Sequence, residues 1–103
     1  MKSFKVTTTP TNNKEALEII ISGDLTIKNV EEFYKRLSDI KRSYNTYNII
    51  LQELQKIDVS CLQVLVAFIS DLKNSSKQVS LTKNLNEEIE KLLQNADMFT
   101  NTI

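Results

Sequence analysis

The sequence predicts a single α/β domain, and three observations lead to that prediction. Short segments rich in β-branched residues, typical of strands, alternate with longer segments whose apolar residues recur at helical spacing. Strands that alternate with helices of this size imply crossover connections and a mostly parallel or mixed sheet with packed helices. With 103 residues, 41% hydrophobic and 25% charged, the chain has the size and composition of one globular domain. We therefore expect residues 1–103 to form one domain in the order β-β-α-β-α-β-α.

The first two strands are predicted at residues 4–8 and 17–21. The first of these segments alternates apolar and polar residues, as a half-buried strand does. Residues 10–14 between them have turn chemistry, because proline fixes φ and asparagine tolerates a left-handed backbone. The short separation favours an antiparallel hairpin, and Gly23 is expected to end the second strand.

Residues 27–42 are predicted as the clearest helix, with Thr26 as its cap. Their apolar residues form one stripe at helical spacing, which we expect to face the core: Ile27, Val30, Phe33, Tyr34, Leu37 and Ile40. Acidic residues lie near the start of this helix and basic residues near its end, as the helix dipole favours.

The second half of the chain continues the alternation. A central strand is predicted at residues 48–51 and a connecting stretch at residues 52–57, followed by a more deeply packed helix at about residues 60–73. A short strand is predicted at residues 78–82. A last helix is predicted from Asn84 onward, with these residues on its inward face: Leu85, Ile89, Leu92, Leu93 and Ala96.

The composition excludes several classes of function. The chain has no histidine, so it cannot by itself build a Ser-His-Asp triad, a Cys-His pair or a histidine-containing zinc site. Gly23 is its only glycine, which excludes glycine-rich phosphate-binding loops. Thirteen basic residues balance thirteen acidic ones, which argues against nucleic acid as a partner. We expect no enzyme activity, no cofactor and no metal site.

The chain is expected to be cytoplasmic and not embedded in a membrane. Its N-terminus has no apolar run of signal-peptide length, and the densest apolar stretch, residues 62–69, is well short of the ~20 residues that span a bilayer. The lone cysteine, Cys61, cannot form an intramolecular disulfide and is compatible with a reducing compartment.

The segment that leads into the second predicted helix is the most informative for function. Residues 54–65 read LQKIDVSCLQVL, and binding sites in open α/β sheets favour such loops beyond the strand ends. A hydroxyl at a helix start, such as that of Ser60, can carry a phosphate without breaking the helix. The local sequence equally allows Asp58 or Ser60 to be an ordinary N-cap, worth about 1 kcal/mol.

Two segments resemble the STAS domain family, which includes bacterial anti-sigma factor antagonists. Residues 22–26 (SGDLT), followed by a helix, resemble the family's loop between its second strand and first helix. Residues 49–62 resemble the next strand and its Asp-Ser-Ser-Gly-Leu-type turn, and the element order extends the similarity over almost the whole chain. Val59 replaces the first hydroxyl residue of that turn, and Cys61 stands where the family usually has glycine.

The resemblance implies a non-enzymatic regulatory module that binds a protein partner. Asp58 matches the acidic residue of the motif, and Ser60 matches the hydroxyl that a partner kinase phosphorylates in anti-sigma factor antagonists. In those proteins the unmodified form binds the anti-sigma kinase and frees the sigma factor for transcription, and phosphorylation prevents this binding. By this resemblance Ser60 is the phosphorylation candidate. The expected partner-binding residues lie in two neighbouring loops: Asp58, Val59, Ser60, Cys61 and Leu62 in one, and Asp24, Leu25 and Thr26 in the other.

Alternatives stay open for the function and for the cysteine. Some small STAS proteins are constitutive cytoplasmic subunits bound to the ATPase of a phospholipid-transport ABC complex, and the relaxed motif at Val59 and Cys61 suits such a role. A small-ligand binder has no specific residue in its support, and a homodimer is a further option. The thiol of Cys61 is either a small buried hydrophobic group or a reactive group whose pKa the helix start lowers.

Overall fold

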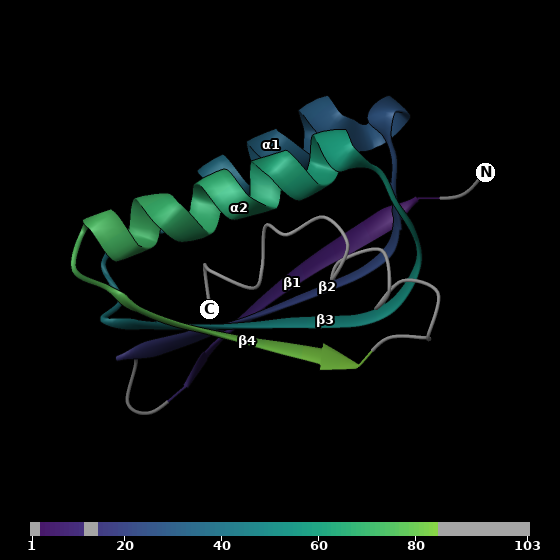
Figure 1. The fold of residues 1–103 in the computed structure, drawn as a ribbon. Helices are drawn as coiled ribbons and strands as arrows, with labels where there is room; N and C mark the ends of the chain where they lie inside the picture. Colours follow the sequence, from purple (N-terminus) through teal and green to yellow (C-terminus); the bar gives the residue numbers. More distant parts are fainter. Residues whose placement is uncertain (1–2, 12–14, 85–103) are drawn as a thin grey trace.

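The computed structural model describes residues 3–11 and 15–84, which form a four-stranded sheet with two α-helices on one face (Figure 1). The elements in chain order are β1 (Phe4–Thr11), β2 (Ala16–Leu25), a 3-10 turn η1 (Ile27–Asn29), α1 (Val30–Ser38), β3 (Thr46–Ile57), α2 (Val59–Asn74) and β4 (Gln78–Asn84). This order confirms the α/β prediction as far as β4. The helix predicted from Asn84 onward falls outside the described residues.

The sheet is mixed, and its strands lie in sequence order β1-β2-β3-β4. β1 and β2 form the predicted antiparallel hairpin, whereas β3 is parallel to β2 and β4 is parallel to β3. Each parallel pair is connected through a helix, and right-handed crossovers bring both helices to the same face of the sheet. Figure 1 shows α1 and α2 side by side on that face.

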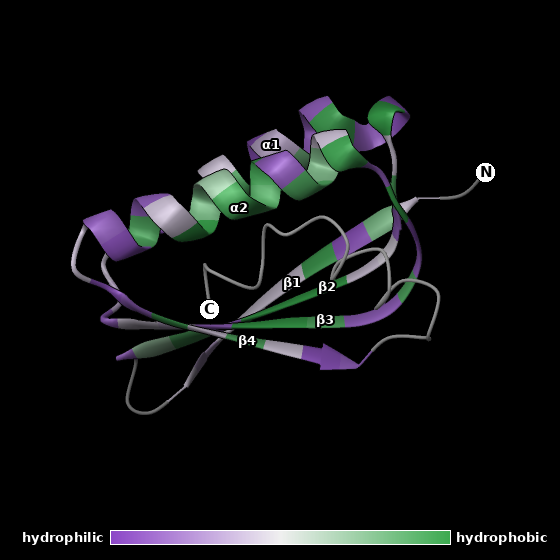
Figure 2. Cartoon of the chain, in the orientation of Figure 1, coloured by the Kyte–Doolittle hydropathy of each residue, from purple (hydrophilic) through white to green (hydrophobic). Residues whose placement is uncertain are grey.

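The core lies between the helices and the face of the sheet that they cover. Alternate residues of β2 and β3 point into it, and α2 contributes more buried side chains than α1, as its wider apolar surface predicts. Figure 2 shows apolar residues along the two central strands and along α2. The largest fully buried side chains of the core include Phe33, Tyr47, Ile19, Ile21, Ile49, Leu51, Leu65 and Ile69.

The prediction of a connecting stretch at residues 52–57 is wrong, because β3 continues through it to its end. Ile21 of β2 pairs with Leu51 and Leu25 pairs with Ile57, so β3 uses six residue steps where β2 uses four. The register shifts are β-bulges, which insert unpaired residues and break the alternation of apolar and polar side chains. The alternation of apolar and polar residues that predicts a strand is therefore absent from the second half of β3.

Two special backbone positions accompany the bulges. Glu53 in β3 has a φ of 51°, a left-handed conformation that non-glycine residues rarely adopt. Gly23 in β2 has a φ of 97°, and a Cβ there would overlap the backbone carbonyl of Ser3. The prediction that Gly23 ends the second strand is therefore wrong, because glycine lets β2 pass through the irregular position and continue to Leu25.

The first helix is shorter than predicted, and two residues assigned to its inward stripe face solvent. Residues 27–29 form a 3-10 turn, and α1 ends at Ser38. Ile27 and Tyr34 are each 62% exposed. Ile27 precedes the regular helix, where the tighter 3-10 turn changes the direction of its side chain. Tyr34 lies next to the fully buried Phe33, so the helical turn carries it away from the sheet.

Candidate functional site

The loops that follow β2 and β3 lie side by side at the N-terminal end of the two helices (Figure 1). Leu25 and Ile57 are the last paired residues of the two parallel strands. Directly after them, the backbone N–H of Asp58 donates a hydrogen bond of 2.8 Å to the carbonyl of Leu25. The fold thus brings together the two segments that the sequence singled out, because parallel strands end at the same edge of a sheet.

Asp58 occupies the N-cap position of α2, but its side chain does not cap that helix. Its Oδ2 instead accepts a hydrogen bond of 2.9 Å from the backbone N–H of Ile27, at the start of η1. Thr26, the expected cap of the first helix, holds the N-cap position of η1 without a side-chain hydrogen bond. The Asp58 carboxylate therefore satisfies an unpaired amide of the neighbouring helical segment rather than one of its own.

Cys61 lies in the first turn of α2 and is fully buried. Its thiol donates a hydrogen bond to the carbonyl of Thr26, with Sγ and O 3.3 Å apart. Burial raises the pKa of this thiol to about 11, the charge of Asp58 adds to the rise, and the nearby Ser60 hydroxyl opposes it. The thiol is neutral near pH 7, so the hypothesis of a reactive cysteine is contradicted and the buried hydrophobic interpretation fits.

The expected partner-binding residues divide into an exposed and a buried group. Four have buried side chains that build the scaffold of the two loops: Asp24, Leu25, Cys61 and Leu62. The other four reach solvent, fully or in part: Thr26, Asp58, Val59 and Ser60. Val59 is the most prominent apolar residue of this group, with 58% of its surface exposed at the first position of α2. A partner docked on these loops would contact the exposed residues, and the buried residues would hold those exposed residues in place.

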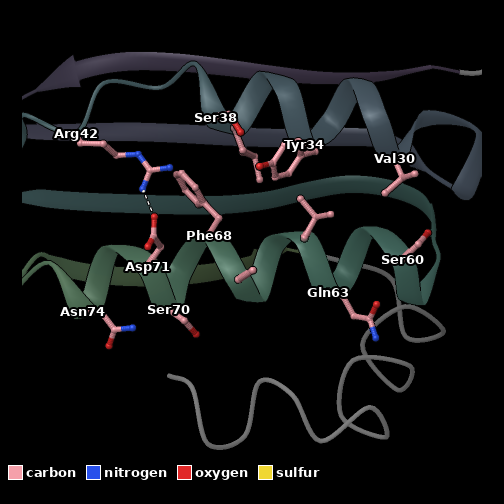
Figure 3. Close-up of a pocket in the computed structure, with 13 residues that line it drawn as sticks. Val30, Tyr34, Ser38, Arg42, Ser60, Gln63, Phe68, Ser70, Asp71 and Asn74 are labelled. Carbon is pink, nitrogen blue, oxygen red and sulfur yellow. Dashed lines mark hydrogen bonds and ion pairs between the residues drawn. The ribbon is translucent and has the colours of Figure 1, made fainter.

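Ser60 is the second residue of α2 and is partly buried. The Oγ atom is closed off from solvent and has no hydrogen-bond partner in the described structure. Ser60 lies at one end of a groove of about 770 Å³ between α1 and α2. Figure 3 shows Ser60 and Val30 near one end of this interhelical groove, and Arg42 and Asp71 near the other.

The interhelical groove was not predicted from the sequence. Tyr34 and Val30 line its α1 side, and Gln63, Val64 and Phe68 line its α2 side.

The exposed residues Ile27 and Tyr34 keep the helical spacing of the core-facing stripe, so the pattern assigned them to the core. Only the placement of the 3-10 turn and of α1 on the sheet reveals that these side chains are outside.

Neither a metal cluster nor a membrane-spanning helix occurs in the described part of the chain. Residues 3–11 and 15–84 contain no group of three or more Cys, Asp or Glu side chains arranged to hold a metal ion. None of the helices in these ranges combines the length and the hydropathy needed to cross a bilayer.

Solved structures with a similar fold come from different kinds of protein. The STAS domain of an antisigma-factor antagonist from Rhodobacter sphaeroides is 17% identical, with a TM-score of 0.66 over 77% of this chain and 85% of that one. The Bacillus cell fate determinant SpoIIAA, in its phosphorylated form, is also 17% identical, with a TM-score of 0.65 over 93% of this chain and 85% of that one. A third structure, of Mglu in its native form, is 10% identical, with a TM-score of 0.64 over 76% of this chain and 23% of that longer one.

Sequence comparison identifies the family. No curated protein matches the chain. A family model described as "Mlab, STAS domain" matches residues 8–100, nearly the whole chain. The match agrees with the fold and with the motif segments at the starts of η1 and α2. The chain belongs to the STAS domain family, and its fold resembles those of anti-sigma factor antagonists.

Proposed function

We propose that the chain is a non-enzymatic bacterial module that binds a protein partner through the start of α2 and the adjoining loop after β2. The observation that carries this proposal is the position of the motif segment. Asp58 and Val59 are exposed at the start of α2, and hydrogen bonds join this segment to the loop at Leu25–Ile27. A rigid pair of loops with an exposed apolar residue suits protein recognition.

The arrangement of polar groups supports binding rather than catalysis. Nucleophilic catalysis needs a hydroxyl or thiol beside a base that activates it. The carboxylate of Asp58 is bound to the Ile27 amide, and the Ser60 hydroxyl has no hydrogen-bond partner in the described structure. The chain contains no histidine to take the role of the base.

We further propose that Ser60 is a phosphorylation switch of the anti-sigma factor antagonist type. A phosphate at the second position of α2 would face unpaired backbone N–H groups and the positive end of the helix dipole. It would add a charge of about −1.5 to −2 beside Asp58. This charge would repel an acidic partner, and the cost of desolvating the phosphate would disfavour an apolar one. Oγ has no hydrogen-bond partner among residues 3–11 and 15–84, so within this part of the chain the hydroxyl can turn toward solvent without losing one.

Mass spectrometry tests the switch. The protein is incubated with ATP and with each serine kinase encoded near its gene, and the modified residue is located by fragmentation. We expect modification of Ser60 and none in the Ser60→Ala variant, whereas a Ser70→Ala variant, which changes an exposed serine of the same helix, is modified like the wild type. Modification at another residue only, or none with any of these kinases, would remove the switch and leave the binding module.

A second candidate function is that of a constitutive cytoplasmic subunit bound to the ATPase of a phospholipid-transport ABC complex. Three observations favour it: Val59 replaces the first of the motif's two hydroxyl residues, the Ser60 Oγ is closed off from solvent, and the matching family model is the Mlab one. Affinity purification of the tagged chain from its own cells separates the two functions. Recovery of a serine kinase supports the first, and recovery of an ATPase with a permease supports the second. Light scattering of the purified chain shows whether a second copy is also a partner.

A further inference from the structure

Three large hydrophobic side chains in the described structure are mostly exposed, and two of them belong to the loops of the candidate site. Ile27 is 62% exposed at the start of η1, and Val59 is 58% exposed at the start of α2. Single exposed hydrophobic residues are common on protein surfaces. The segments that carry these two residues are joined by a hydrogen bond, which the backbone N–H of Ile27 donates to the carboxylate of Asp58, the residue before Val59.

Asp58 makes two of the three hydrogen bonds that join these segments. Its N–H donates to the Leu25 carbonyl at 2.8 Å, and its Oδ2 accepts from the Ile27 N–H at 2.9 Å. The third bond runs from the Cys61 thiol to the Thr26 carbonyl. Three consecutive residues, Leu25 at the end of β2 and Thr26 and Ile27 after it, are therefore each hydrogen-bonded to the start of α2. The carboxylate bond is charge-assisted and short, which makes it the strongest of the side-chain links.

We propose that Asp58 is a positioning residue that fixes Ile27 beside Val59, so that the two aliphatic side chains form one apolar contact surface for the protein partner. The role of the partner rests on the proposed function, whereas the positioning role belongs to the chain alone. Ile27 is thereby added to the binding residues. Val59 gives the surface its character, because it replaces a hydroxyl residue of the family motif with an apolar one at an exposed position. This surface would recognise a partner that places an apolar side chain against Ile27 and Val59, where the two loops shield that side chain from water.

The geometry separates this role from ordinary N-capping. An N-cap side chain accepts a hydrogen bond from the second or third amide of its own helix, here Ser60 or Cys61. Asp58 makes no such bond, and its carboxylate serves the neighbouring segment instead. Loss of the carboxylate should therefore free the Ile27 amide and leave the first turn of α2 largely unchanged.

Amide hydrogen exchange of the isolated protein, followed by NMR, tests the positioning role without any partner. In Asp58→Ala we expect the Ile27 amide to exchange at least about tenfold faster, the scale of losing a hydrogen bond to a charged group. Asp58→Asn keeps an acceptor oxygen and should restore most of the protection. Asp71→Ala, which removes an exposed carboxylate at the other end of α2, should leave Ile27 unchanged. Unchanged exchange at Ile27 in Asp58→Ala, or acceleration only at Ser60 and Cys61, would overturn the positioning role.

Binding measurements with the partner recovered by affinity purification test the contact surface. We expect Ile27→Ser and Val59→Ser each to weaken binding by about tenfold, the scale of an interface residue that matters. The double variant should lose less than the product of the two effects, because the side chains share one contact. Wild-type affinity of Ile27→Ser together with weak binding of Val59→Ser would overturn the shared surface and leave the proposed function intact. Wild-type affinity of both variants would place the proposed function itself in the wrong part of the molecule.

Discussion

The two ends of the helix pair are held together in different ways. At the N-terminal end, short groups join the segments: the Asp58 carboxylate, the Cys61 thiol and backbone amides, at distances of 2.8–3.3 Å. At the other end, Arg42 and Asp71 form an ion pair of 3.1 Å with side chains that are 41% and 69% exposed. The Arg42 guanidinium also lies 4.9 Å from the centre of the Phe68 ring.

The N-terminal end of the helix pair has the more fixed geometry of the two. Short side chains and backbone groups have few rotatable bonds, so each hydrogen bond fixes its segment at a small cost in entropy. The long side chains of an exposed ion pair lose more freedom and are screened by salt, so such a pair contributes little. At the end that carries the family motif, several short hydrogen bonds therefore join the starts of the two helical segments to each other. At the other end the Tyr47 hydroxyl bonds the chain after α1, at the Lys41 carbonyl and the Tyr44 amide, and the ion pair joins that chain to α2.

The largest expected loss of stability comes from a change to the backbone near the N-terminal end of the helix pair. Gly23→Ala should lower the free energy of unfolding by about 3 kcal/mol, because alanine disfavours the positive φ and its Cβ meets the Ser3 carbonyl. Denaturation by urea measures the loss. Ser22→Ala, at the neighbouring half-buried residue, is the matched control and should change stability by about 0.5 kcal/mol or less. A loss below about 1 kcal/mol in Gly23→Ala would show that the loop tolerates a different backbone path.

The second effect concerns the buried thiol that helps join the two loops. Burial and the Asp58 charge raise the pKa of Cys61 from 9.0 to about 11. The unfolded chain then releases its thiol proton at a lower pH than the native one does. The stability that comes from the protonated thiol is therefore fully present below pH 9 and is lost as the pH rises through about 11, by about 2–3 kcal/mol at the highest pH.

Urea denaturation from pH 8 to pH 11 measures this loss against a Cys61→Ala variant. The variant keeps Cβ but has no thiol to ionise, so its free energy of unfolding should fall less steeply with rising pH. Tyr47 also titrates at high pH, but it is present in both proteins and its effect cancels in the comparison. Parallel curves would mean that the thiolate is accommodated in the fold.

The third effect tests the C-terminal end of the helix pair. Arg42→Ala should lower stability by about 1 kcal/mol, since it removes both the ion pair and the contact with Phe68. Asp71→Ala removes the ion pair alone and should cost about 0.5 kcal/mol or less, an effect that disappears in about 1 M salt. Equal losses that persist at high salt would show that this end is as firmly fixed as the other.

The smallest expected change in stability concerns the strained backbone of Glu53, in the bulged half of β3. Glu53→Gly should raise the free energy of unfolding by about 0.5 kcal/mol, because glycine adopts a φ of 51° without the strain of a Cβ. Gln55→Gly, in the same half of β3 and without a positive φ, should lower it instead. Thermal unfolding of the two variants measures the difference, and destabilisation by both would mean that Glu53 is not strained.

The sequence predicts the order of elements well because burial follows periodicity. The alternation in β2 and the start of β3, and the helical spacing in α2, match the side chains that the fold buries. The second half of β3 is lost from the pattern because its bulges shift the register against β2. Those bulges depend on the pairing of two strands and are not encoded in local spacing.

The candidate site is predicted in its location but not in its bonds. The motif resemblance points to residues 22–26 and 49–62, which the fold brings together. The partner of the Asp58 carboxylate lies 31 residues earlier in the chain, so local reasoning assigns it to its own helix as an N-cap. The exposure of Ile27 was missed because it continues the spacing of the buried stripe.

The partner surface at the start of α2 is best tested by the affinity of the recovered partner for two charge variants. Val59→Glu places a carboxylate at the exposed first position of α2, where the helix dipole tolerates it, and Thr82→Glu places one at an exposed position of β4. We expect Val59→Glu to weaken binding by at least about tenfold, the factor that 1.4 kcal/mol represents, and Thr82→Glu to bind like the wild type. Wild-type affinity in Val59→Glu, with a loss in Thr82→Glu, would contradict a partner surface at the start of α2.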